Sequence, residues 1–301
     1  MKSKFTLIVL LAFAPFTFTL TSAQMPIVVS EDSIRIGKSV LPALSVTIPE
    51  SEFDKTLKAW IRELQAGTKS KVVTENSEMS IFGARIKSIS PNPVNIYSKL
   101  DKLDSMLVLS ASFETKKDEY IVGSSGAPEF AKAKDFLKEF SKVQYTDVAK
   151  DQANAEEKKL KDLERELSSL ENEKSRMQKS IESNKNSIIS EKENITLMNN
   201  ELNTVKVARV GQDSILTSME EGPAKKAKAE EIKDLERRNR KAQNSIESSE
   251  KKIQRSNEDI EKATNSIPQN ERMQEKVREQ ILQQQAVYDK YAEKLKRIKA
   301  Y

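Results

Sequence analysis

The stretch that decides the fold is LKDLERELSSL at residues 160–170, which returns as IKDLERRNRKA at residues 232–242. Around both copies an apolar side chain recurs at every seventh position, and a second apolar set lies three residues after the first. These are the a and d positions of a coiled coil. The a positions are Leu160, Leu167, Ile181, Ile188, Ile195 and Leu202 in the first arm, and Ile232, Ile246, Ile253, Ile260, Ile267, Ile281, Tyr288 and Leu295 in the second. The pattern predicts an antiparallel α-helical coiled-coil hairpin with arms at residues 149–209 and 223–301.

The segment VGQDSILTSMEEGP at residues 210–223 carries the signals of a turn between the two arms. Gly211 can end the first helix, and Gly222 followed by Pro223 can open the second. We therefore expect the hairpin tip at residues 210–222, with both helices formed by one chain.

The register between the arms can be predicted by matching polar residues with polar residues, because a buried polar group without a partner is costly. The favoured register places Glu191 opposite Asn239 and Thr146 opposite Gln284. A register shorter by one heptad is the alternative, but it places Glu191 opposite an isoleucine.

The N-terminus has the features of a secretory signal peptide at residues 1–23. Lys2 and Lys4 precede an apolar run that ends in Thr21-Ser22-Ala23, which predicts cleavage after Ala23. An uncleaved N-terminal anchor is the alternative. The chain has no cysteine, so it can form neither a disulfide nor a lipid-modified N-terminus. We expect a bacterial protein, periplasmic or secreted, with no transmembrane segment after cleavage.

The composition excludes several classes of chemistry. The chain contains no histidine and no cysteine, which excludes histidine-dependent triads, zinc sites and thiolate catalysis. The acidic residues expected on loops, Asp101, Asp104, Asp118 and Glu119, do not have the spacing of a calcium loop. The net charge of +5 comes from dense but balanced charges, as on a solvated helical surface. We therefore expect no catalytic residue, no cofactor and no metal site.

A short extended leader is expected at residues 24–37, followed by a head domain at residues 38–148. Alternating apolar residues and turn signals predict strands at 43–48, 71–74, 80–87, 94–97, 106–113 and 120–122. One helix is predicted from Phe53 to Leu64, with Ser51 as the start of a capping box, and another from Pro128. In the second helix, residues from Phe130 to Val143 should face the sheet. The fold class is thus α+β, with a small antiparallel sheet and two packed helices as the head.

The second arm carries the one local concentration of basic residues, and it is a candidate for contact with anions. Its members are Lys225, Lys226, Lys228, Arg237, Arg238, Arg240 and Lys241. Acidic residues alternate with them, which favours a solvated face over a binding site for anionic envelope polymers. No aromatic residue is present for base stacking, so nucleic acid is not an expected partner.

Tyr288 and Tyr291, near the end of the second arm, are a candidate partner-binding surface. The alternative is that they are core residues, since the predicted register brings the end of this arm back to the head near Phe140 and Val143.

The expected function is that of a non-enzymatic scaffold or adaptor protein of the cell envelope, which binds a protein partner or associates with itself through the coiled coil. Small and polar residues at core positions such as Ser249 and Asn270 make the predicted helix pairing weak, which favours such association. The alternative is a holdase-type periplasmic chaperone. An enzyme is disfavoured.

Overall fold

The computed structural model describes residues 26–75, 77–125 and 128–301, so the predicted signal peptide lies outside the described residues. The chain forms two compact units. The first, called the head here, runs up to Ala155 and includes Asp289–Tyr301. The second, called the hairpin, is Glu156–Tyr288.

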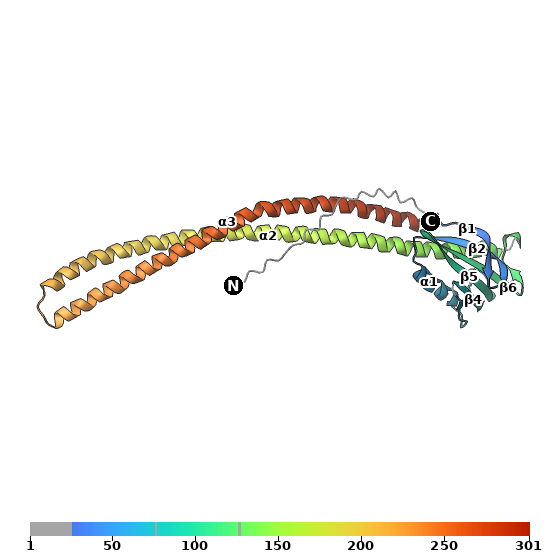
Figure 1. Ribbon diagram of the computed structural model, residues 1–301, viewed down its shortest axis with the longest axis horizontal. Helices are drawn as coiled ribbons and strands as arrows, with labels where there is room; N and C mark the ends of the chain where they lie inside the picture. Colours follow the sequence, from blue (N-terminus) through green and yellow to red (C-terminus); the bar gives the residue numbers. More distant parts are fainter. Residues whose placement is uncertain (1–25, 76, 126–127) are drawn as a thin grey trace. The chain divides into compact units, whose positions relative to one another are not determined.

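The head contains a seven-stranded antiparallel sheet. Its order is β1-β2-β6-β5-β4-β3, with β7 pairing with β6 (Figure 1). The strands are β1 (Val29–Ile36), β2 (Ser39–Pro49), β3 (Val73–Glu75), β4 (Glu78–Ala84), β5 (Val94–Leu103), β6 (Met106–Lys116) and β7 (Glu119–Tyr120). The predicted α+β class, with strands before the long helices, is confirmed.

Two helices cover one face of this sheet. They are α1 (Phe53–Gln65) and the first turns of α2 (Pro128–Ser218), which are connected through strands β3 to β7 and a short 3-10 helix at Gly123–Ser125. Trp60 of α1 is fully buried, and its indole nitrogen donates a 2.9 Å hydrogen bond to Ser98 Oγ of β5. The Phe140 ring of α2 packs edge-on against Trp60, at 4.9 Å between ring centroids. The apolar face predicted for each helix therefore forms the core.

The head differs from the predictions in four places. The expected leader is strand β1, which pairs with β2 along its whole length. The strand expected at residues 94–97 is longer: β5 continues to Leu103, because its residues pair with β6 as far as Met106. The capping box is absent: Ser51 Oγ donates to the Pro49 carbonyl, and Glu52 is the N-cap. Val143 was predicted to face the sheet, but it is 46% exposed.

In the hairpin, the 91-residue α2 packs antiparallel against the 77-residue α3 (Pro223–Lys299) (Figure 1). The prediction that the first helix ends near Gly211 is wrong, because α2 continues to Ser218 and the tip is only residues 219–222. One glycine inside a helix costs about 1 kcal/mol, which a helix of this length tolerates.

The predicted register is also wrong: each residue of one helix faces a residue of the other that lies ten positions further along the chain than expected. Ser249 Oγ donates to Glu191 Oε2 at 2.7 Å, where Asn239 was expected. Gln284 Nε2 donates to Glu156 Oε2 at 2.7 Å, where Thr146 was expected. The shift follows from the shorter tip, which moves the turn toward the C-terminus. Polar residues still meet polar residues in the observed register.

Helix α3 runs through Pro268 without a break. Among the described residues, no helix is long and apolar enough to cross a membrane.

Candidate functional site

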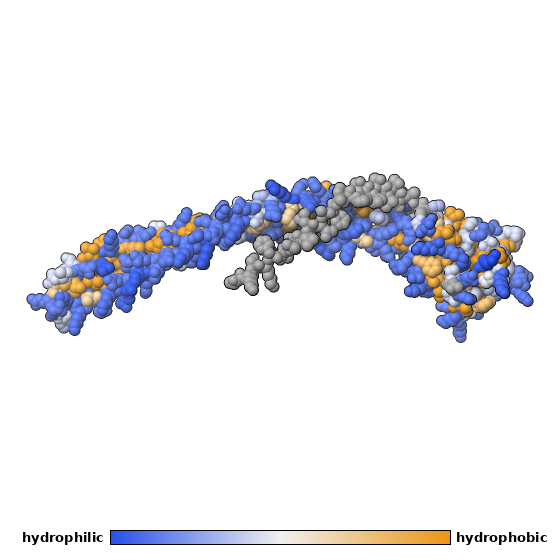
Figure 2. Space-filling model, in the orientation of Figure 1, coloured by the Kyte–Doolittle hydropathy of each residue, from blue (hydrophilic) through white to orange (hydrophobic). Residues whose placement is uncertain are grey.

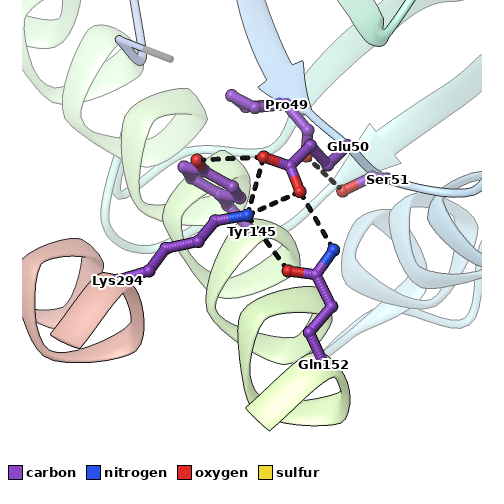
Figure 3. Close-up of polar contacts among 6 residues, drawn as sticks. All are labelled: Pro49, Glu50, Ser51, Tyr145, Gln152 and Lys294. Carbon is purple, nitrogen blue, oxygen red and sulfur yellow. Dashed lines mark hydrogen bonds and ion pairs between the residues drawn. The ribbon is translucent and has the colours of Figure 1, made fainter. Parts of the chain in front are cut away.

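The candidate site is a polar cluster in the head formed by Glu50, Tyr145, Gln152 and Lys294, called the Glu50 cluster here (Figure 3). Glu50 follows the last residue of β2, where the chain turns toward α1. Its φ angle is 55°, in the left-handed region that non-glycine residues seldom adopt. The Glu50 N–H donates a 3.0 Å hydrogen bond to the Ser105 carbonyl in the turn between β5 and β6. This bond helps to hold the unusual backbone conformation.

The other three residues come from the two long helices. Tyr145 and Gln152 of α2 are seven residues apart, which is about two helical turns, so both side chains lie on one side of the helix. Lys294 lies in the last turns of α3, which belong to the head. Figure 3 shows all three side chains pointing toward the Glu50 carboxylate.

The Glu50 carboxylate accepts hydrogen bonds from every other member of the cluster. Lys294 Nζ lies 2.8 Å from Oε1 and 2.6 Å from Oε2. Gln152 Nε2 donates to Oε2 at 3.0 Å, and the Tyr145 hydroxyl donates to Oε1 at 3.4 Å. Lys294 also donates to Gln152 Oε1 at 3.0 Å. The Lys294 side chain is therefore enclosed by acceptors, and its charge is balanced by Glu50.

An apolar contact lies beside these polar ones. Ile298, one turn after Lys294, is fully buried and packs in one cluster with Tyr145 and Ala149 of α2. The Lys294 ammonium lies 5.6 Å from the centre of the Tyr145 ring, within the range of a cation–π contact. The predicted return of the C-terminal helix to the head is thus confirmed, but Ile298 packs against Tyr145 and Ala149, where Phe140 and Val143 were expected.

The electrostatics keep Glu50 ionised. Burial desolvates the carboxyl and by itself would raise its pKa, but the hydrogen bonds from Lys294 and Gln152 outweigh this effect. The pKa of Glu50 is therefore lowered from 4.5. A carboxylate in this state is a poor general acid near neutral pH. The arrangement is suited to joining the C-terminal helix to the sheet.

Most of the basic residues singled out from the sequence are neutralised by nearby acids. Lys225 pairs with Glu221, Lys228 with Glu231, Arg237 with Asp234 and Arg238 with Glu201, at 2.6 to 2.9 Å. Within the described part of the chain, Lys226, Arg240 and Lys241 take part in no ion pair. The structure therefore does not gather the seven cations into one unpaired group.

The tyrosines singled out near the C-terminus are both half-buried on α3. Tyr288 is the last residue of the hairpin, and Tyr291 belongs to the head. Their half-buried state leaves part of each side chain exposed to solvent.

The head also has a hollow of about 790 Å³ between α1, the segment after β4 and α2. Six of its lining residues are charged, three of each sign: Glu63, Arg85, Lys87, Lys132, Asp135 and Glu139. Among the described residues none of the six forms an ion pair, so water can solvate them all.

Sequence reasoning did not identify the Glu50 cluster. Its members are spread over 244 residues of sequence, and nothing local marks Glu50 except the Pro49-Glu50-Ser51 turn. Comparison of the sequence with protein-family models and with curated proteins yields no match.

Proposed function

We propose that this protein is a non-enzymatic coiled-coil scaffold or adaptor of the cell envelope, secreted or periplasmic, which binds a protein partner. The observation that carries the proposal is the architecture of the long helices. Helix α2 begins in the head, and α3 ends in the head, where Lys294 bonds to Glu50. A long helical hairpin whose two helices both continue into one folded domain suits a protein that binds a partner along its helices.

The length of the hairpin supports a scaffold role. From Glu156 to Ser218, at 1.5 Å per residue, α2 spans roughly 95 Å. The head core needs only the first turns of this helix. The repeated a and d pattern, with the two helices crossing in Figure 1, favours a coiled coil for this segment.

The hairpin surface near the tip supports partner binding. Several large apolar side chains are exposed on the half of α2 nearer the tip: Ile189, Leu197, Val207, Val210 and Ile215. Figure 2 shows hydrophobic residues gathered over the hairpin near its tip. Exposed apolar side chains grouped in this way are typical of protein-binding surfaces.

The proposal is tested by photo-crosslinking in the native cell. A photoreactive amino acid at Val210 should give a discrete crosslinked partner. The matched control is the same group at Leu282, an equally apolar and exposed position on α3 that lies outside the group near the tip. If neither position captures a protein, the adaptor function is wrong.

The same exposed residues favour the alternative of a holdase-type chaperone, which would use them to bind unfolded clients. An aggregation assay separates the two functions. An adaptor should leave the aggregation of an unfolded model protein unchanged at equimolar concentration, whereas a holdase should suppress it.

A further inference from the structure

A second group of residues with binding chemistry lies on the sheet face opposite to α1 and α2. The strand register pairs Asn95 with Glu114 and Tyr97 with Ser112 across β5 and β6, and pairs Glu114 with Tyr120 across β6 and β7. Directly paired residues point to the same face of a sheet, and successive residues alternate between faces. All five side chains therefore lie on the outer face, because their neighbours Ile96 and Phe113 are in the core.

Phe82 of β4 completes the group. Its ring lies 6.0 Å from the Tyr97 ring, at 84° to it, and 57% of the residue is exposed. It occupies an irregularity in β4, between Ile81 and Ala84, where Gly83 has a φ of 71°. The Gly83 N–H donates to Asn95 Oδ1 at 3.0 Å, which fixes this irregularity. We call Phe82, Tyr97, Tyr120 and Glu114 the outer-face patch.

Glu114 is a buried carboxylate at the base of this patch, only 7% exposed. Asn95 Nδ2 donates to Oε2 at 2.8 Å, the Tyr97 hydroxyl donates to Oε2 at 3.2 Å, and the Asp118 N–H donates to Oε1 at 3.0 Å. The Asn95 hydrogen bond has the largest effect on the pKa of Glu114, which is lowered from 4.5 in spite of burial. Glu114 is therefore negatively charged at neutral pH.

No cation neutralises this charge among the described residues. The neighbouring lysines on the same face are engaged elsewhere: Lys99 pairs with Asp101 at 2.9 Å, and Lys116 pairs with Glu119 at 3.4 Å. Three hydrogen bonds stabilise the ionised carboxylate, but none of them comes from a cation, so they leave its negative charge without a counter-ion. The charge can therefore attract a cation from outside the chain.

A further polar group on this face is unsatisfied. Ser112 is 1% exposed, and within the described chain its hydroxyl has no hydrogen-bond partner. It lies directly across from Tyr97. The site therefore combines a buried negative charge with three aromatic rings, above a buried hydroxyl that has no partner.

We propose that the outer-face patch binds an arginine side chain of a protein partner. A guanidinium is planar, weakly hydrated and always charged, so it stacks on aromatic rings more readily than a lysine ammonium does. The rings of Phe82 and Tyr97 offer the stacking surface, and Glu114 supplies the opposite charge. This inference rests on the proposed function only in taking the ligand to be part of a protein.

The test is titration of the intact protein with a short arginine-rich peptide, followed by fluorescence anisotropy of a label on the peptide. The neutral control is the same peptide with citrulline in place of arginine, which keeps the shape and removes the charge. Glu114→Gln and Phe82→Ala should each weaken binding of the arginine peptide by roughly tenfold. Leu103→Ala is the matched control for Phe82→Ala, because Leu103 is about as exposed on the same sheet and lies outside the patch.

The expected result is binding of the arginine peptide alone, weakened by both patch variants and unchanged by Leu103→Ala. Equal binding of the citrulline peptide, no binding of either peptide, or undiminished binding to Phe82→Ala would each overturn the proposal. Phe82→Ala keeps the test valid if Glu114→Gln does not fold. Failure here leaves the adaptor function intact if Val210 still captures a partner in cells, so the two proposals fail separately.

Discussion

Lys294 Nζ lies 2.6 Å from Glu50 Oε2, although 244 residues separate the two in sequence. The Lys294 side chain is only 10% exposed and that of Glu50 25%. The contact joins the last turns of α3 to the end of β2, so the head contains both ends of the described chain. A pair enclosed to this degree is screened less by solvent than the exposed ion pairs along the hairpin.

Lys294→Met should destabilise the head, because it leaves the Glu50 carboxylate partly buried without its cation. We expect a loss of about 1 to 3 kcal/mol in the free energy of unfolding, measured by denaturation followed through Trp60 fluorescence. Arg297→Met is the matched control. It removes the same charge from the same helix end, where Arg297 pairs with exposed Glu293, and should cost less than about 0.5 kcal/mol. Equal losses in the two variants would contradict the role given to Lys294.

The contribution of Glu50 should depend on pH. Its pKa in the folded protein is lowered from 4.5, so the unfolded chain takes up the proton first as the pH falls. The stability that Glu50 contributes is therefore complete well above pH 4.5 and is lost as the pH falls through the folded pKa. The difference in stability between the wild type and Glu50→Gln should be largest near pH 7 and should shrink toward pH 3. A difference that stays constant over this range would disprove the pKa shift.

Ile298→Ala should also destabilise the head, by about 2 to 4 kcal/mol, since it removes buried apolar contacts with Tyr145 and Ala149. Thermal unfolding followed through Trp60 measures the effect. Leu282→Ala on the same helix removes an exposed side chain and should change the melting temperature little. If Ile298→Ala also leaves the melting temperature unchanged, the C-terminal turns are not part of the head core.

The architecture could be predicted because it depends on local patterns. The heptads predict two long helices, and the Gly222-Pro223 signal correctly predicts that α3 begins at Pro223. The register could not be predicted, because it depends on where α2 ends. Gly211 suggested an early end, but the helix hydrogen bonds continue past it to Ser218. Strand β1 was missed because its exposed Glu31, Asp32 and Ser33 hide the alternation of a strand.

The candidate sites were harder to predict for a physical reason. The Glu50 cluster depends on a contact across 244 residues, and only the correct helix register brings Lys294 opposite Gln152. The outer-face patch depends on strand pairing. Tyr97 lies opposite Ser112, and Glu114 lies opposite Asn95 and Tyr120, so that Tyr97 and Glu114 lie on one face of the sheet. The residues chosen from the sequence were instead a group of basic residues and a pair of tyrosines. Most of these basic residues form ion pairs with acidic residues of the same chain.

The central structural claim is that a single chain forms both helices of the hairpin in the observed register. Asn194 Nδ2 lies 2.8 Å from Ser249 Oγ, and the chain has no cysteine of its own. Cysteines at these two positions should therefore form a disulfide, whereas cysteines at Glu191 and Asn239, the pair expected from the sequence, should not.

The most direct measurement uses a refolded mixture of ¹⁴N- and ¹⁵N-labelled chains that carry Asn194→Cys and Ser249→Cys. After oxidation and digestion, mass spectrometry reads the isotopes of the two linked peptides. We expect linked pairs that are entirely light or entirely heavy, because both cysteines belong to one chain. Linked pairs with one light and one heavy peptide in random proportion would show instead that the helices pair between chains.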